Sequence, residues 1–359
     1  MRHEKRFLII LLLVSLLIVG CGTGTEPVGE VEEPVAEEVD VEEPSTEEEE
    51  EVEAPVVEEP LMVAAVLPST TEDLGWSQSL VDGLREVQQE LGGEEAMQLA
   101  FTENMWNPVD AEAALRDYAA SGYDIVFAHG SGWESFVPAV AADFPDVTFA
   151  WGTGTDTFGL PNVFAYRALA YEGGYVIGVM AATLSETGAI GAVGAVDAGG
   201  AHLYLGGFEK GILDTNPDAT PLISFTGDWN DITLATQAAE TLVDAGVDVM
   251  TGTSQIMVGS IAVAQENGVL WFGNEVDCTS LAPDIVVAGL IDDYSVIVRN
   301  ILEERANGVY GGLWYDLTLE NGGLRILFNE SFDVPDEVLA AGEAAIQGII
   351  DGTIDPTFE

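Results

Sequence analysis

The chain has 359 residues, of which 47% are hydrophobic, and its 10 lysines and arginines face 63 aspartates and glutamates, a formal net charge of −53. That is enough apolar material for two α/β domains, each with its own core. The charge repels phosphate backbones, which excludes nucleic acid as a partner, and it disfavours strongly anionic ligands. A saline habitat would favour the same composition. The two cysteines, Cys21 and Cys278, imply no disulfide framework.

The N-terminus predicts a lipoprotein signal peptide over residues 1–20. A basic start is followed by an apolar run from Phe7 to Val19, which is shorter than the ~20 residues of a membrane span. The run ends in Leu17-Ile18-Val19-Gly20-Cys21, which resembles the bacterial lipobox and implies cleavage before Cys21 and lipidation of this residue. An uncleaved anchor is the alternative. Both interpretations predict that the folded part of the chain lies outside the cytoplasmic membrane, in the periplasm or at the cell surface.

Residues 21–60 consist of Glu, Val and Pro repeats around five consecutive glutamates, Glu47 to Glu51. Such a segment lacks the apolar residues for a core and repels itself, so we expect a disordered acidic tether. A specific acidic binding tail is the alternative.

From Leu61 onward, short apolar runs alternate with segments of helical spacing. We expect strands near 61–67, 123–128, 147–151, 189–194, 221–225, 247–250, 269–273, 286–290 and 312–317, with helices between them and a last helix over 335–348. This alternation indicates βαβ units and parallel sheets flanked by helices. We assign residues 61–165 and about 290–311 to lobe 1, and residues 166–289 and about 312–359 to lobe 2. Two such lobes with several connections fit hinge closure around a ligand.

Three loops that join a strand to a helix carry an aromatic residue among polar ones. They are Asp73-Leu74-Gly75-Trp76-Ser77-Gln78, His129-Gly130-Ser131-Gly132-Trp133 and Gly227-Asp228-Trp229-Asn230-Asp231. In open α/β sheets, ligands bind at the carboxyl ends of the strands, where such loops lie. An exposed tryptophan is costly unless something stacks on it. We therefore expect Trp76 and Trp229 in a ligand cleft, and Trp133 either in the cleft or packed at a helix start.

For several other residues, the sequence favours a structural role or a place on the surface. Trp106, Trp151, Trp271 and Trp314 lie beside or within strand-like runs and are expected to be structural, and Asp277, Asp292 and Asp293 are expected to be solvated surface acids. His129 is either a donor in the cleft or a hydrogen-bonded loop residue.

Catalytic motifs are scarce in this sequence. It has no Gly-x-Ser-x-Gly elbow, no phosphate-binding lysine loop and three histidines, one of them in the signal region. Gly191-Ala192-Val193-Gly194 is better explained by tight packing than by a dinucleotide. We expect no enzyme, no cofactor and no metal.

The order and spacing of several short motifs from Leu61 to about Phe328 resemble the basic membrane protein (BMP) family, the substrate-binding lipoproteins of ABC importers that include purine nucleoside receptors. These motifs are Asp73 to Gln78, Phe144-Pro145-Asp146-Val147, Asn162-Val163, Tyr171-Glu172-Gly173-Gly174-Tyr175, Ala245-Gly246-Val247-Asp248-Val249 and Phe272-Gly273-Asn274-Glu275. The resemblance implies a two-lobed type I periplasmic-binding fold, a ligand buried between the lobes and ABC permease subunits as partners.

The resemblance also implies a site in which two aromatic residues sandwich a purine. Trp76 matches the stacking residue of lobe 1, Trp229 or Asn230 falls where the second aromatic is expected, and Glu275 matches an Asp that holds ribose. The expected ligand-binding residues are Asp73, Trp76, Ser77, Gln78, Trp133, Trp229, Asp231, Asn274 and Glu275.

Two positions depart from the family pattern, and both bear on whether the ligand is a nucleoside or a free base. Glu275 replaces the shorter Asp, and Asp292-Asp293 fall where many members have a Lys. The Asp-Leu-Gly-Trp form of the first motif is similar to a branch that prefers free purine bases. We predict a lipid-anchored receptor for a purine nucleoside or nucleobase. The alternatives are a nucleoside hydrolase, or a sensory binding protein for another aromatic ligand, such as a flavin, or for a sugar.

Overall fold

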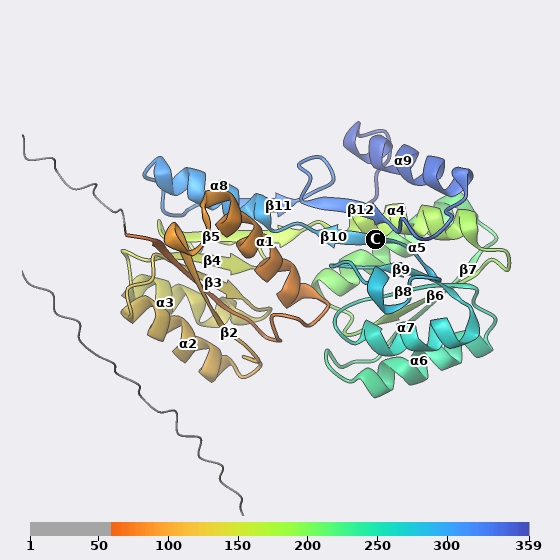
Figure 1. The fold of residues 1–359 in the computed structure, drawn as a ribbon, viewed down its shortest axis with the longest axis horizontal. Coiled ribbons are helices and arrows are strands. Elements are labelled where there is room, and N and C mark those ends of the chain that lie inside the picture. The colour runs from red at the N-terminus through yellow and green to blue at the C-terminus, as the bar shows by residue number, and fades with distance from the viewer. Residues whose placement is uncertain (1–58, 359) are drawn as a thin grey trace, which may run out of the picture. The chain divides into compact units, whose positions relative to one another are not determined.

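The computed structural model describes residues 59–358. The predicted signal peptide, Cys21 and nearly all of the acidic tether lie outside this range. Among the helices of the described range, none combines the length and the apolar character needed to cross a bilayer. The described residues fold into two lobes, each built on a six-stranded sheet, as expected from the alternating pattern (Figure 1).

The sheet of lobe 1 has the strand order β11-β5-β4-β3-β1-β2, and every neighbouring pair in it is parallel. Its strands are β1 (Leu61–Val66), β2 (Met97–Thr102), β3 (Ile125–His129), β4 (Thr148–Gly152), β5 (Val163–Ala168) and β11 (Trp314–Leu317). The inner strands β3 and β4 are buried along their whole length, as expected for a parallel sheet covered on both faces.

The sheet of lobe 2 has the order β12-β10-β9-β8-β6-β7 and is parallel except for its edge strand β12, which runs antiparallel to β10. Its strands are β6 (Ala189–Gly194), β7 (Thr220–Phe225), β8 (Val249–Gly252), β9 (Leu270–Gly273), β10 (Val286–Asp292) and β12 (Leu324–Phe328). The fold class is therefore the predicted one.

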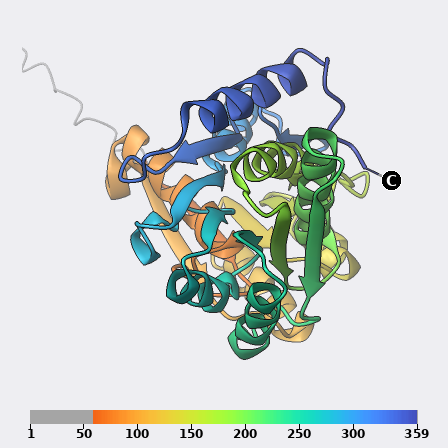
Figure 2. The ribbon, with the colours of Figure 1, turned by 90° about the vertical axis from the view of Figure 1, so that its right-hand side faces the viewer.

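Helices cover both faces of each sheet. They are α1 (Trp76–Leu91), α2 (Pro108–Ala120), α3 (Val137–Asp143), α4 (Ala170–Leu184), α5 (Gly199–Thr215), α6 (Ile232–Asp244), α7 (Met257–Asn267), α8 (Ser295–Ala306) and α9 (Asp336–Ile350). In lobe 1, α1 and α8 pack together on one face, and α2 and α3 cover the other (Figure 1). In lobe 2, α4 packs on α5 and α9 on one face, while α6 and α7 cover the opposite face (Figure 2).

The largest hydrophobic cluster extends through both lobes. It lies under α1 and α8 in lobe 1 and under α4 and α5 in lobe 2, and it includes Leu80, Phe208 and Leu290. Two smaller clusters lie under α2 and α3 and under α6 and α7. Because the main cluster is shared between the lobes, burial of apolar surface holds them together as well as stabilising each one.

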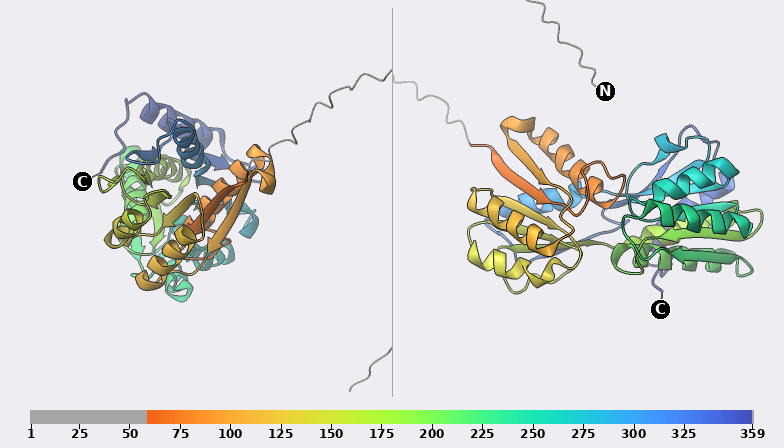
Figure 3. Two further views of the ribbon diagram at one scale, coloured as in Figure 1. Left: turned by 90° about the vertical axis from the view of Figure 1, so that its left-hand side faces the viewer. Right: turned by 90° about the horizontal axis from the view of Figure 1, so that it is seen from below.

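The chain passes between the lobes three times: from β5 to α4, from β10 to α8, and from β11 to β12 (Figure 3). One assigned boundary needs correction. We assigned residues 312–359 to lobe 2, but β11 pairs in parallel with β5 and so belongs to the sheet of lobe 1. The strand β5 and the two edge strands β2 and β12 were not singled out from the sequence. Edge strands are packed on fewer sides, so their apolar pattern is weaker.

Candidate ligand-binding site

A cavity of about 370 Å³ lies between the two lobes at the carboxyl ends of their parallel strands, which is where open α/β sheets bind ligands. It is lined by Pro68, Ser69, Asp73, Trp76, Ser77, Met105, Trp106, Ser131, Trp133, Thr153, Tyr166, Arg167, Ala168, Ala170, Gly199, Gly200, Ala201, Leu203, Trp229, Ser254, Gln255, Asn274, Glu275, Asp292 and Tyr294. Its size and mainly apolar, aromatic lining fit a small-molecule site.

The loop before α1 connects the two lobes across this cavity. Asp73 Oδ1 accepts hydrogen bonds from the backbone N–H groups of Gly75 (2.9 Å) and Gln78 (3.1 Å), which fixes the turn. Leu74 has a φ of 56° and packs against the hydrophobic cluster under α6 and α7 of lobe 2. Gly75 approaches lobe 2 so closely that an added Cβ would lie 3.1 Å from Glu275 Oε2. The described structure is therefore closed at this loop.

Four residues form an aromatic cluster beside the cavity: Trp76, His129, Tyr166 and Tyr294. The rings of Trp76 and His129 are stacked with 3.7 Å between their centroids and 28° between their planes. The Trp76 indole N–H donates to Tyr294 Oη at 2.8 Å. Since one face of the Trp76 indole lies on His129, its other face is the one available to a ligand.

His129 is a neutral, fully buried member of this cluster. Its Nε2 lies 3.0 Å from the carbonyl oxygen of Trp76, which can only accept, so Nε2 carries the hydrogen. Its Nδ1 then accepts from the Tyr166 hydroxyl at 2.8 Å. Burial lowers the pKa of His129 from 6.5 to about 3. His129 is thus a hydrogen-bonded support for Trp76, one of the two roles considered from sequence.

Three carboxyl groups around the cavity form an acidic group: Asp73, Glu275 and Asp292. Each keeps one buried oxygen without a hydrogen-bond partner in the described part of the chain: Asp73 Oδ2, Glu275 Oε2 and Asp292 Oδ1. Burial, reinforced by the charges of Asp292 and Asp73, raises the pKa of Glu275 well above its usual value. Burial raises the pKa of Asp292 to about 7. Unpaired buried carboxyl oxygens are costly unless a ligand supplies the missing donors.

Backbone strain accompanies these residues. Glu275, Ser254 and Thr153 all line the cavity and have positive φ angles of 71°, 62° and 143°. Such conformations cost on the order of 1–3 kcal/mol each and cluster at ligand sites, where the surrounding fold holds them.

Arg167 brings a positive charge to the cavity lining, but this charge is already paired. Its Nε donates to Asp316 Oδ1 at 2.8 Å and its Nη2 to Asp316 Oδ2 at 3.3 Å. Arg167 is the last but one residue of β5 and Asp316 lies on β11, so the ion pair links two neighbouring strands beside a crossover. The cavity therefore offers acceptors rather than a free cation to a ligand.

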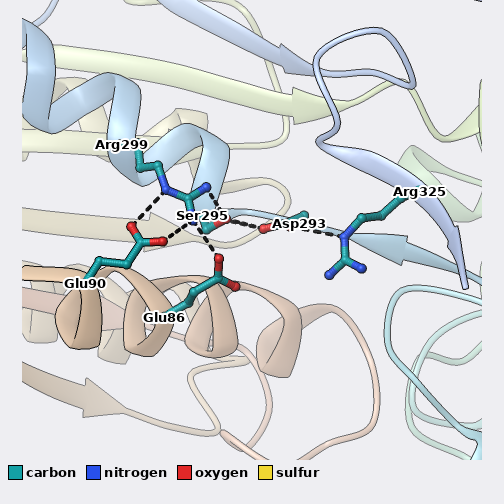
Figure 4. Close-up of polar contacts among 6 residues, drawn as sticks. All are labelled: Glu86, Glu90, Asp293, Ser295, Arg299 and Arg325. Carbon is teal, nitrogen blue, oxygen red and sulfur yellow. Dashed lines mark hydrogen bonds and ion pairs between the residues drawn. The ribbon is translucent and has the colours of Figure 1, made fainter.

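The crossover from β10 to α8 carries a chain of polar contacts that joins the lobes (Figure 4). Arg325 on β12 of lobe 2 donates to Asp293 Oδ2 at 3.2 Å, and Asp293 accepts from the Ser295 N–H at 3.1 Å. Arg299 binds Ser295 Oγ, and it also pairs with two glutamates of α1, Glu86 and Glu90. Asp293 is thus part of this hinge network and is not a freely solvated acid.

Seven of the residues predicted to bind ligand line the cavity: Asp73, Trp76, Ser77, Trp133, Trp229, Asn274 and Glu275. Trp133 is only 3% exposed and packs over Gly130, so most of its surface is in the core of lobe 1. Gln78 and Asp231 do not line the cavity. Gln78 Oε1 accepts from the Leu74 N–H at 2.9 Å, and Asp231 caps α6 by accepting from the Leu234 N–H at 3.0 Å.

Besides the one about Asp293, two further expectations are wrong. Trp106 was expected to be structural, yet it lines the cavity and is 43% exposed. Asp292 was expected to be a solvated acid, yet it is 6% exposed and lines the cavity. The reason is that β10 continues two residues beyond the apolar run and ends at Asp292, which puts this side chain at the carboxyl edge of the sheet. Tyr166 was missed because an aromatic residue in an apolar run is usually part of the core, and Tyr294 because it follows two acids outside the three aromatic loops.

Within residues 59–358, no group of three or more His, Cys, Asp or Glu side chains is arranged to hold a metal ion.

Comparison with known proteins identifies the family. The model of the Bmp family, described as ABC transporter substrate-binding protein PnrA-like, matches residues 61–350. The chain belongs to the Bmp family. The resemblance that the sequence motifs suggested is thereby confirmed. Bmp family membership makes this chain a substrate-binding protein of the ABC transporter type, a class that works with a small-molecule ligand and permease subunits.

Individual relatives agree with this assignment. A purine-binding protein of Brucella abortus is 29% identical over 286 residues, which is 79% of each chain. A protein of Haloferax volcanii, whose name suggests an ABC transporter glucose-binding protein, is 26% identical over 303 residues, 82% of this chain and 75% of that one. The solved structure of an ABC transporter solute-binding protein from Conexibacter woesei superposes with a TM-score of 0.70 at 23% identity, covering 82% of this chain and 97% of that one.

Proposed function

We propose that this chain is the lipid-anchored, extracytoplasmic receptor of an ABC importer and that it binds a purine base or purine nucleoside between its lobes. The observation that carries the proposal is the placement of Trp76. Its indole is backed by His129, fixed by a hydrogen bond to Tyr294 and included in the cavity lining, so it offers a rigid flat surface to a flat ligand. Stacking on such a surface contributes about 1–3 kcal/mol for a nucleobase.

The acidic group supplies the polar half of the proposed recognition. Carboxyl oxygens without partners match the N–H groups of a purine edge or the hydroxyl groups of a ribose. The name of the Brucella abortus relative supports a purine as the ligand class. Tight capture of a nucleotide is disfavoured, because its phosphate would meet three carboxyl groups and an Arg167 that is already paired.

A sugar is the second candidate ligand. The name of the Haloferax volcanii relative suggests glucose, and carboxylates beside aromatic rings also suit sugar hydroxyl groups. Isothermal titration of unliganded protein with adenine, guanine, adenosine, guanosine, inosine and glucose separates the candidates. We expect micromolar or tighter binding of at least one purine and none of glucose; binding of glucose alone would reject the purine proposal.

We propose that the protein carries its ligand unchanged. The cleft acids are also the residues that the rival nucleoside hydrolase would use, so the same samples should be analysed for chemistry. Incubation with adenosine and inosine should leave both intact, as judged by chromatography of the free bases. Sustained release of adenine or hypoxanthine would mean that the protein is an enzyme and not a receptor.

The lipid anchor is tested separately. Cys21 lies outside the described residues, and its lipidation is proposed from the motif at the end of the apolar run. Cells given a labelled fatty acid should incorporate it into the wild-type protein and not into the Cys21→Ser variant, which should also leave the membrane fraction. Equal labelling of the two proteins would exclude Cys21 as the acceptor.

A further inference from the structure

Asp292 is the member of the acidic group whose position the proposed function leaves unexplained. It is the last residue of β10, lies directly before the crossover to α8 and lines the cavity. Its backbone N–H donates to the Glu275 carbonyl oxygen at 3.0 Å, which fixes it next to that residue. The side chain is buried to 94%, since 6% of it is exposed, and Oδ1 has no hydrogen-bond partner among residues 59–358.

The groups around Asp292 do not neutralise it. Glu275 lies beside it and Asp73 lines the same cavity, each with its own unpartnered oxygen. The hydroxyl groups of Tyr294 and Tyr204 lie close enough for the charge of Asp292 to raise their pKa values. The nearby cations are engaged elsewhere: Arg325 on the adjoining strand β12 pairs with Asp293, and Arg167 pairs with Asp316.

This environment affects the protonation of two neighbouring acids, Glu275 and Asp292. Burial raises both pKa values, and at Glu275 the charges of Asp292 and Asp73 act in the same direction. Two like charges side by side cannot both ionise at low cost, so a charge on Asp292 favours the protonated form of Glu275. In the unliganded protein, the ionised form of Asp292 is a desolvated acceptor with an unmet hydrogen bond.

We propose that Asp292 determines the specificity of the cavity: its ionised carboxylate accepts a hydrogen bond from an N–H or O–H group of an uncharged or cationic ligand, and protonation of Asp292 releases that ligand. The inference rests on the proposed function, since the ligand is taken to be a purine. The proton balance is simple. Binding to a protein whose Asp292 is protonated expels one proton to solvent, and uptake of that proton accompanies release.

The direction of the pH effect follows from this balance. The ligand binds the ionised form, so its affinity is constant well above the pKa of Asp292, which is about 7, and falls as the pH drops below it. The limiting slope is about tenfold in Kd per pH unit. His129 does not contribute in this range, because its pKa is lowered to about 3.

The test measures Kd for adenine and adenosine by titration calorimetry from pH 8.5 to pH 5.5 on the wild type and on Asp292→Asn. For the wild type we expect Kd to weaken about thirty-fold over this range and nearly one proton to be released per ligand at pH 5.5, the latter read from buffers of different ionisation enthalpy. For Asp292→Asn we expect a Kd at pH 8.5 at least tenfold weaker than that of the wild type and independent of pH. Asp277→Asn is the matched control, because Asp277 is an exposed acid two residues after Glu275. Its Kd should show the same pH dependence as that of the wild type.

Three outcomes decide the inference. A flat wild-type profile without proton release overturns it even if Asp292→Asn does not fold, because that measurement needs no variant. A slope that persists in Asp292→Asn assigns the titration to another group and also overturns it. If none of adenine, guanine, adenosine, guanosine and inosine binds the wild type at pH 8.5, the proposed function fails, and the inference falls with it. Melting of the unliganded proteins gives a further check: Asp292→Asn should melt higher than the wild type at pH 8, and at pH 5 this advantage should shrink.

Discussion

The aromatic cluster and the acidic group face the same cavity and satisfy their polar atoms in opposite ways. Within the aromatic cluster, the indole N–H of Trp76 and both ring nitrogens of His129 have partners inside the protein. In the acidic group, each of the three carboxyl groups keeps a buried oxygen without a partner in the described residues. One side of the cavity is therefore complete without a ligand, and the other is not.

This difference assigns two separate tasks to the two sides. A stacking surface that is already rigid loses little freedom on binding, so it contributes affinity to any flat ligand. Buried acceptors that need donors discriminate strongly, because a molecule without matching donors leaves them unpaired. We expect changes in the aromatic cluster to weaken all flat ligands alike, and changes in the acidic group to alter the choice among them.

The largest expected effect comes from Trp76→Ala. It should weaken binding of adenine and adenosine by about ten- to a hundred-fold at pH 8, because a stacking contact of about 1–3 kcal/mol is lost. The melting temperature should also fall, since His129 and Tyr294 each lose a partner. Titration calorimetry and thermal melting measure both changes.

Trp314→Ala is the matched control for Trp76→Ala. Trp314 is 56% exposed on the edge strand β11 and does not line the cavity. Its removal should leave Kd within about twofold of the wild type. Equal losses of ligand affinity in the two variants would mean that Trp76 acts through the stability of the protein and not through stacking on the ligand.

The next prediction concerns the effect of His129, in the aromatic cluster, on the stability of the protein at low pH. The pKa of His129 is lowered to about 3, below its ordinary 6.5, so the unfolded chain binds a proton more readily than the folded one. The contribution of His129 to the free energy of unfolding should therefore fall as the pH drops below 6.5, by about 2 kcal/mol between pH 7 and pH 5. Replacing His129 by Gln removes this loss.

Urea unfolding of wild type and His129→Gln at pH 7, 6 and 5 measures the effect. The two free energies of unfolding should converge as the pH falls. The raised pKa of Asp292 acts in the opposite direction, favouring the folded state at low pH, but it is present in both proteins and cancels in the comparison. Parallel curves would show that His129 is accessible to protons in the folded state.

Within the acidic group, Glu275 should respond differently from Asp292. Because burial raises the pKa of Glu275 and favours its protonated form, Glu275→Gln retains a neutral donor and acceptor, and Kd for adenine should stay within about threefold of the wild type at pH 7. Glu275→Ala should weaken binding tenfold or more. A loss restricted to adenosine would assign Glu275 to the ribose. If Glu275→Gln costs as much as Asp292→Asn, the proton is not on Glu275.

The smallest effect is expected at Asp231 and Gln78, which the sequence suggested as ligand-binding residues but which do not line the cavity. Asp231→Ala should reduce the free energy of unfolding by about 1 kcal/mol through loss of the α6 cap. Neither Asp231→Ala nor Gln78→Ala should change Kd by more than about twofold. A tenfold loss in either variant would mean that the ligand extends beyond the described cavity.

The residues that sequence reasoning found and those it missed differ in a physical way. Asp73 and Trp76 stand out because their loop interrupts an apolar pattern at a strand end, and this signal is local. Tyr294 and Asp292 give no such signal. Tyr294 stands between Asp293 and Ser295, outside the three loops that carry the aromatic signal. Asp292 reads as surface, because charged residues rarely lie inside a protein.

The sequence by itself determined the alternation of strands and helices, the two-lobed parallel architecture and the family, because these depend on periodicity and on motifs that are local in the chain. Only the tertiary structure decided which side chains meet in the cavity. Asp73, Glu275 and Asp292 are far apart in the sequence and come together at strand ends of two different sheets. Their burial and mutual repulsion, which set their protonation, exist only once the lobes have closed on each other.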